Sequence, residues 1–369
     1  MLIRILQLGK QTGSFSLLLW LTIVTPAQAH QLRVAVTPKI SQVTISTSTP
    51  AIVSDGNGRA VGALQPQQGL IAQVKQDKIA VGDAQLTQLW VKPQQGGYIW
   101  IGGRWYRGSV QVIPSGKQLI AVNHVDLEQY LYSVLGAEMS ANFPAEALKA
   151  QAVAARTYAL YRCQSTSQKL FDVDSTQASQ VYRGLSSEAN TTQAAVNDTL
   201  GQIVTYQGKP ILAVFHAASG GHTENVEDIW SDRVPYLRGV PDYDLDTPGS
   251  EWTQTFTNSQ LSQSLKISRI KSIAPDRTTQ FGSVVSLKVS GDQDQILTGS
   301  QVRTALKLRS LRFKITPTPE GFLFTGRGYG HALGLSQWGA YNLAQQGMKY
   351  SSILAHYYRG VELSNLPPN

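Results

Sequence analysis

The chain has 369 residues, a formal net charge of +8, 42% hydrophobic residues and one cysteine. A single cysteine excludes an intramolecular disulfide, and no Lys/Arg block or nucleic-acid motif supports a nucleic-acid partner. The length suits one large or two ordinary domains, and the modest positive charge suits a polyanionic partner such as a cell wall.

Residues 1–29 have the features of a secretory signal peptide. They begin with two basic residues, continue with an apolar run over 15–24, and end in the small-x-small sequence Ala-Gln-Ala. The apolar run is shorter than a transmembrane helix requires, and the alternative is an uncleaved anchor. We expect cleavage before His30, no transmembrane segment after it, and export to the periplasm or cell wall.

Residues 30–121 are predicted to form a β-rich N-terminal part. Period-two alternation predicts strands over 32–36 and 42–46, and further strands are expected over 98–101 and 109–113. The Gln-rich stretch 65–95 has no clear pattern and favours a solvated loop.

Two helices are predicted on either side of an acidic residue. Apolar spacing predicts a helix that starts after a capping Asp126 and ends at Gly136. An alanine-rich stretch over 145–160 predicts a second, buried helix. Glu138 is then expected in the short connection, facing a cleft. Arg156 interrupts an apolar face of the second helix, so it either pairs with a buried acid such as Asp126 or binds a peptide carboxylate.

The second half of the chain contains two glycine-rich segments. The first, 216–225, follows a hairpin predicted over 202–206 and 210–215, and its small residues let a ligand approach the backbone. The second, 326–340, leads into a helix predicted over 337–346. Between them we expect a strand over 283–289, a helix over 299–308, and paired strands over 311–315 and 321–325. The predicted fold is α+β, with residues 30–121 packed on a helical catalytic part, 122–369, and a substrate cleft between the two.

Two segments resemble the stage II sporulation protein D (SpoIID)/LytB family, whose members act on peptidoglycan: 136–162 and 326–340. In that family, the glutamate of a Glu-Met-Pro step is the catalytic acid of a lytic transglycosylase. Glu138 matches it, although Ser140 replaces the proline. The resemblance implies that Glu138 protonates the bond between N-acetylmuramic acid and N-acetylglucosamine. It then accepts a proton from the muramoyl C6 hydroxyl, so that 1,6-anhydro ends form without a second carboxylate.

Residues of the two glycine-rich segments, together with Arg156, are candidate substrate contacts beyond Glu138. The candidate substrate-binding residues are Arg156, His216, Ser219, His222, Gly328, Tyr329, His331 and Gln337. Tyr329 can alternatively be read as a core aromatic. His216 and His222 lack a standard zinc spacing, so we expect no metal and no cofactor. Some relatives bind zinc in this region, and zinc at these two histidines is the alternative.

The expected partner is the glycan strand of peptidoglycan, with stem peptides removed. One rival function is that of a LytB-like amidase enhancer or peptidoglycan-binding module, which would hold glycan or an N-acetylmuramoyl-L-alanine amidase without cutting. Another is a metal-dependent amidase centred on His216 and His222. An intact Glu138 favours the enzyme over the binding module. The lack of a third metal ligand argues against the amidase.

Overall fold

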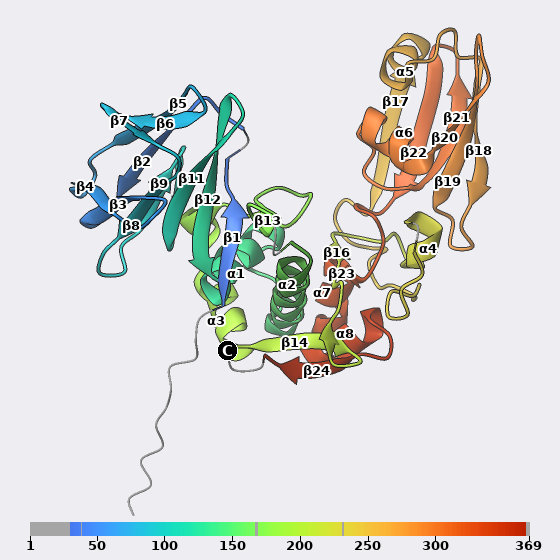
Figure 1. Ribbon diagram of the computed structural model, residues 1–369. Coiled ribbons are helices and arrows are strands. Elements are labelled where there is room, and N and C mark those ends of the chain that lie inside the picture. Colours follow the sequence, from blue (N-terminus) through green and yellow to red (C-terminus); the bar gives the residue numbers. More distant parts are fainter. Residues whose placement is uncertain (1–29, 38, 167–168, 231, 367–369) are drawn as a thin grey trace, which may run out of the picture.

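The computed structural model describes residues 30–37, 39–166, 169–230 and 232–366, so the predicted signal peptide lies outside the described residues. In these ranges, no helix is both long and apolar enough to cross a membrane. The fold is α+β, as predicted. Figure 1 shows a blue-to-green body of strands, a central group of helices, and an orange body of strands and helices set apart from them.

The N-terminal part consists of two sheets that share one hydrophobic core with the helices. The first sheet has the order β13-β1-β12-β11-β8-β3-β4, with β1 (Gln31–Ala35), β3 (Ala51–Asp55), β4 (Ala60–Leu64), β8 (Leu89–Pro93), β11 (Ser109–Ser115), β12 (Gln118–Asp126) and β13 (Val173–Asp174). The second has the order β10-β9-β2-β5-β6-β7, with β2 (Gln42–Thr47), β5 (Leu70–Lys75), β6 (Lys78–Val81), β7 (Ala84–Leu86), β9 (Ile99–Ile101) and β10 (Arg104–Tyr106).

One expectation for this part is wrong. The Gln-rich stretch 65–95 is not a loop, because it contains β5, β6, β7 and β8. Buried Leu70 and Ala72 alternate with exposed Ile71 and Gln73, and the strands are too short for this alternation to stand out in a sequence window. The boundary after residue 121 falls inside β12, which runs on to Asp126 and delivers the chain directly into the first helix.

The central helices pack around α2 (Ala145–Thr166), which contacts α1 (Leu127–Glu138), α3 (Asn190–Asp198), α7 (Gln337–Gln345) and α8 (Tyr350–Tyr357). Its alanines are fully buried over most of the helix, and small side chains allow this close packing on several sides. The helix extends six residues beyond the predicted end at 160, so Cys163 lies within it. A small sheet of β15 (Lys209–Pro210), β14 (Gln202–Tyr206) and β24 (Glu362–Asn365) flanks this group.

Gly136 does not end α1, which continues to Glu138. The glycine is required for packing instead. A Cβ atom there would lie 1.9 Å from the carbonyl oxygen of Ser187, in the 3₁₀ helix η1 (Gly184–Ser187). The predicted cap at Asp126 is confirmed, since its carboxylate accepts from the backbone N–H groups of Glu128 and Gln129.

The hairpin predicted over 202–206 and 210–215 forms only at its turn, where β15 pairs with β14. The chain then leaves that sheet, and β16 (Phe215–His216) pairs in parallel with β23 (Leu335–Ser336). This short pairing brings the two glycine-rich segments together. The short helix α4 (Val226–Ile229) follows the first of them.

The third body has its own hydrophobic core, which includes Trp252, Leu287 and Phe324. It is built from β17 (Glu251–Thr257), α5 (Asn258–Leu265), β18 (Ser272–Thr278), β19 (Val284–Ser290), β20 (Gln295–Thr298), α6 (Gly299–Leu306), β21 (Arg312–Thr318) and β22 (Gly321–Arg327). The strands form two sheets, β17-β22-β21 and β18-β19-β20. Its second half matches the predicted strand, helix and strand pair.

Candidate functional site

Glu138 is the last residue of α1, and its carboxylate accepts a hydrogen bond of 2.7 Å from the backbone N–H of Val181. Burial raises the pKa of Glu138, because an ionised carboxyl loses hydration in apolar surroundings. The Val181 N–H, the positive charge of Arg183 and a hydrogen bond with the side chain of Gln337 each oppose this rise in pKa. Glu138 is therefore a largely buried acid whose proton is held more tightly than usual.

The partner Gln337 comes from the second glycine-rich segment and begins α7. Ser336 caps that helix by accepting from the Gly339 N–H at 3.2 Å, which fixes where Gln337 stands. Beside it, the ring of Trp338 lies 4.9 Å from that of Phe143, in the α1–α2 connection. The structure thus brings Glu138 and the predicted residue Gln337 together, with an aromatic contact next to them.

A second group contains the buried His216 and the partly buried His331, whose Nδ1 atoms have opposite hydrogen-bonding roles. His216 Nδ1 faces the carbonyl of Leu333 at 3.1 Å, so it carries the proton and leaves Nε2 as an acceptor. His331 Nδ1 instead accepts from the Leu333 N–H at 3.0 Å. Burial lowers the pKa of His216 to about 4 and that of His331 to about 3, so both are neutral at pH 7.

Tyr329 and Gly328 lie next to this histidine pair. Tyr329 exchanges backbone hydrogen bonds with Ala218, and 48% of its surface is exposed, which excludes the core-aromatic alternative. Gly328 has a φ of +82°, and a Cβ there would lie 2.8 Å from the Ala218 carbonyl oxygen. The glycine therefore permits a turn and a close backbone approach that other residues do not.

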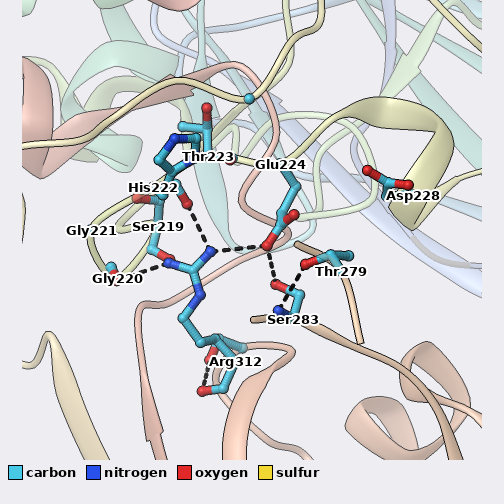
Figure 2. Close-up of polar contacts among 12 residues, drawn as sticks. Ser219, Gly220, Gly221, His222, Thr223, Glu224, Asp228, Thr279, Ser283 and Arg312 are labelled. Atoms are coloured by element: carbon cyan, nitrogen blue, oxygen red, sulfur yellow. Dashed lines mark hydrogen bonds and ion pairs between the residues drawn. The ribbon is translucent and has the colours of Figure 1, made fainter. Parts of the chain in front are cut away.

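The first glycine-rich segment is held by the third body, as Figure 2 shows. Arg312 donates to the carbonyls of Ser219, Gly220 and His222 at 2.8–3.0 Å, and to Glu224 Oε1 at 2.9 Å. Glu224 is fully buried and also accepts from the Ser283 hydroxyl at 2.6 Å. A guanidinium that binds three carbonyls and one carboxylate fixes the shape of this loop.

Ser219 and His222, both predicted substrate contacts, face protein partners. The Ser219 hydroxyl is buried and donates to Asp242 at 2.6 Å. His222 stacks on Phe281 with ring centroids 3.7 Å apart, and its Nδ1 lies 2.7 Å from the Thr223 carbonyl. The side chains of these two residues therefore help to build the loop.

Arg156 is fully buried, and its ion-pair partner is Glu128 rather than the expected Asp126. Nε and Nη2 donate to the two carboxylate oxygens at 2.8 and 2.6 Å, Nη2 also donates to the Val196 carbonyl, and Nη1 donates to the Gln202 carbonyl. With its donors used in this way, the guanidinium has no face left for a peptide carboxylate.

Across the ranges that the structure describes, no group of three or more His, Cys, Asp or Glu side chains has an arrangement suited to a metal ion. Sequence reasoning missed the two contacts of Glu138 at Val181 and Arg183, and it missed Arg312. Val181 contacts Glu138 through its backbone N–H, so its residue type does not identify it as a site residue. Arg312 and its cross-strand neighbour Arg327 are both arginines at the end of a predicted strand, so the sequence does not distinguish them. In the structure, Arg312 binds the first glycine-rich segment.

Comparisons with known proteins match both parts of this arrangement. A family model described as "Stage II sporulation protein" matches residues 115–206, and a domain of unknown function (DUF8618) matches residues 249–334. The stage II sporulation protein D of Bacillus subtilis (strain 168) is 35% identical over 272 residues, which cover 69% of this chain and 79% of that protein. An uncharacterized protein of Brachyspira hyodysenteriae is 38% identical over 272 residues, or 71% of this chain and 73% of that protein.

The amidase enhancer of Bacillus subtilis is 32% identical over 292 residues. These cover 64% of this chain but 40% of the enhancer. The first family model includes Glu138, Val181 and Arg183, and the second coincides with the third body from β17 to β22.

Proposed function

The chain belongs to the stage II sporulation protein D family, which supports a role at the cell wall, and from this premise we propose that it is a peptidoglycan lytic transglycosylase. Glu138 is its single acid and base. The observation that carries the proposal is the burial of Glu138, which raises the pKa of a carboxyl in contact with Gln337. An acid catalyst must hold its proton near neutral pH before it can give it to a leaving group.

The proposed reaction has two proton transfers on one residue. Protonated Glu138 gives its proton to the glycosidic oxygen as the bond to C1 of N-acetylmuramic acid breaks. The carboxylate then takes the proton of the C6 hydroxyl of the same sugar, whose oxygen bonds to C1. The products are a free C4 hydroxyl on N-acetylglucosamine and a 1,6-anhydro end, and no water is consumed. Gln337 and the Val181 N–H stabilise the carboxylate in between.

A hydrolase would need a second carboxylate about 5–10 Å from the first. Asp126 does not qualify, because it caps the opposite end of α1, about 18 Å away at 1.5 Å per residue. Glu224 is bound to Arg312. Asp174 and Glu138 both act on the Tyr130 phenol and raise its pKa, although less than burial does. Asp174 is thus the residue to test if water proves to be the nucleophile.

The central test compares wild-type protein with Glu138→Gln on purified glycan strands from which stem peptides have been removed. Mass spectrometry should find 1,6-anhydro-muramoyl ends with the wild type. The variant should lose a factor of at least about 10²–10⁴ in rate, because its amide cannot transfer the proton. Reducing ends in place of anhydro ends would contradict the transglycosylase mechanism.

Glu146→Gln is the matched control for this assay. Glu146 lies on α2 and accepts from the backbone N–H of Tyr350 at 2.8 Å, an acceptor role that a glutamine oxygen can keep. It should therefore retain nearly full activity. We also propose that no metal takes part, so EDTA should leave the rate unchanged; a loss that zinc restores would contradict this.

The likeness to the amidase enhancer supports a second candidate function, in which the chain stimulates an N-acetylmuramoyl-L-alanine amidase without cutting glycan. This function predicts that wild type and Glu138→Gln stimulate amidase equally and that neither forms anhydro ends.

In either case we propose export with cleavage before His30, which N-terminal sequencing of protein from the native host tests.

A further inference from the structure

A cleft of about 250 Å³ lies in the N-terminal part, at the end of α1 that is far from Glu138. Its walls come from β1, the β8–β9 connection, β11, the end of β12 and the first turn of α1. Lys92, Ser109 and His124 line it, and each of them is next in sequence to a residue of the hydrophobic core. The cleft is therefore on the face of the first sheet that is turned away from that core. Its volume is below the range typical of drug-sized ligands, so it suits a single ring.

An aromatic ring with a fixed cation beside it lines this cleft. Tyr98 is 36% exposed, and the guanidinium carbon of Arg107 lies 5.5 Å from the centroid of its ring. Nε and Nη2 of Arg107 each donate to Glu188 at 2.8 Å, which holds the guanidinium in place. Within the described residues, Nη1 has no such partner. The exposed part of the Tyr98 ring can thus pack on the apolar face of a ligand, next to a donor whose position is set.

His124 contributes a hydrogen-bond acceptor to the cleft. The side-chain amide of Gln111 donates to Gln88 Oε1 at 3.0 Å, so its oxygen accepts from His124 Nε2 at 3.1 Å. Burial lowers the pKa of His124 to about 4, so the imidazole is neutral at pH 7. Nδ1 is then unprotonated, and it makes no hydrogen bond within the described part of the chain. An imidazole that is 7% exposed and has an open acceptor at a cleft wall suits a ligand hydroxyl group.

The charged side chains at the cleft balance one another. Lys92 and Arg107 are the cations that line it, and Asp126 is the acid. Glu188, whose side chain is 8% exposed, neutralises Arg107. Two positive and two negative charges leave no net field to attract an ion, which favours a neutral ligand over a carboxylate or a phosphate.

The remaining side chains both donate and accept hydrogen bonds. Gln31 and Gln129 line the cleft with amide groups, and Ser109 adds a hydroxyl. A pyranose ring has complementary chemistry: each hydroxyl group donates and accepts, and the C–H groups on a ring face pack on an aromatic side chain.

We propose that this cleft binds one pyranose ring of a neutral glycan, as a second sugar site separate from the one at Glu138. Asp126 caps α1 and Glu138 ends it, so the two sites are about 18 Å apart at 1.5 Å per residue. Most of the lining, including Tyr98 and Arg107, precedes residue 115, where the match to the family model begins. The choice of a glycan rests on the proposed function. The cleft adds to that function a contact that holds the glycan away from the bond that is cut.

The test locates bound sugar in the full chain carrying Glu138→Gln, so that no ligand is cut. The probe is chitotriose with a photoreactive diazirine at its reducing end. After irradiation, mass spectrometry of the digested protein should find label on the peptides that line the cleft and, separately, on peptides around Glu138. Tyr98→Ala should reduce the cleft label about 10-fold below saturation, because ring stacking is lost, and leave the label around Glu138 within about twofold.

Two matched variants control for other effects of the substitution. Tyr98→Phe keeps the ring and should keep the cleft label within about twofold. Ile71→Ala removes an equally exposed apolar side chain from β5 in the second sheet and should change neither label. Loss of cleft label in Tyr98→Phe as large as in Tyr98→Ala would contradict ring stacking.

Competition tests the charge of the ligand. Unlabelled chitotriose should displace the cleft label, and trigalacturonate, an acidic trimer of the same length, should not. Stronger competition by trigalacturonate would overturn the assignment of a neutral sugar. Label around Glu138 alone, or equal loss of both labels in Tyr98→Ala, would overturn the cleft as a site. Label in the cleft alone would support the cleft and instead count against the proposed function at Glu138.

Discussion

At the residue scale, the burial of Glu138 destabilises the fold at neutral pH and suits the residue to act as an acid. Burial raises its pKa in the folded protein above the value of 4.5 for an ordinary glutamate. The folded state then binds the proton more tightly than the unfolded state does. Stability attributable to this group is complete below pH 4.5 and is lost as the pH rises through the folded pKa. A residue that weakens the fold at neutral pH is typical of a functional position.

We therefore predict that Glu138→Gln increases the free energy of unfolding relative to the wild type. The gain should be small at pH 4 and grow as the pH rises above 4.5, because glutamine has no proton to lose. Urea denaturation at several pH values measures it, and Glu320→Gln, in an exposed turn, controls for the loss of one negative charge. A gain that does not depend on pH would contradict the prediction.

Several site residues can be predicted from the sequence, because residue type and spacing within a motif identify them. Glu138 and Gln337 were both named from the two signature segments, and the structure brings them together. Val181 could not be predicted, since any residue has the N–H that it donates. For Arg156, a lone arginine in an apolar helix predicts a buried ion pair. The sequence offers several acids as the partner, and the structure shows that the partner is Glu128.

At the element scale, the contact between α1 and η1 sets where Glu138 meets the Val181 segment. Gly136 is at the centre of that contact, because the Ser187 carbonyl occupies the space of a side chain. A sequence shows a glycine without showing which of its properties is used. The end of α1 was therefore predicted two residues early, on the assumption that Gly136 supplied a left-handed cap.

For Gly136→Ala, two physical effects have opposite signs. Helix propensity alone would stabilise the protein by about 0.8–1 kcal/mol. The 1.9 Å approach to a backbone oxygen instead forces α1 and η1 apart, so we predict a lower melting temperature and weaker cleavage. Thermal unfolding and the glycan assay measure both. Ser140→Ala, at an exposed position just after α1, should change neither the melting temperature nor cleavage. A higher melting temperature for Gly136→Ala would contradict the prediction, because α1 and η1 would then separate at little cost.

At the scale of the whole molecule, Arg312 and Glu224 join the third body to the rest of the chain (Figure 2). The Glu224 side chain is fully buried and that of Arg312 is 14% exposed. Desolvation makes such a pair a poor source of net stability, yet removal of one partner leaves the other charge buried and unpaired.

Arg312→Met should accordingly cost about 3–5 kcal/mol of unfolding free energy. Arg327→Met is the control, since Arg327 is the cross-strand neighbour and its ion pair with Glu251 is exposed. That change should cost at most about 1 kcal/mol. Adding Glu224→Met to Arg312→Met should recover part of the loss but not all, because three loop carbonyls stay without a donor. Equal costs for the two single arginine variants would rule out a special role for Arg312.

The parallel pairing of β16 with β23 also has a consequence for the order of assembly. Gln337 follows that pairing directly, and the whole third body is synthesised between the two strands. Until it has been made, α2 lacks the cover of α7 and α8, and Glu138 stays hydrated on an incompletely packed helix. A hydrated carboxyl is ionised at neutral pH and cannot protonate a sugar. If the proposed function holds, the chain becomes able to cleave glycan only once α7 and α8 have packed on α2.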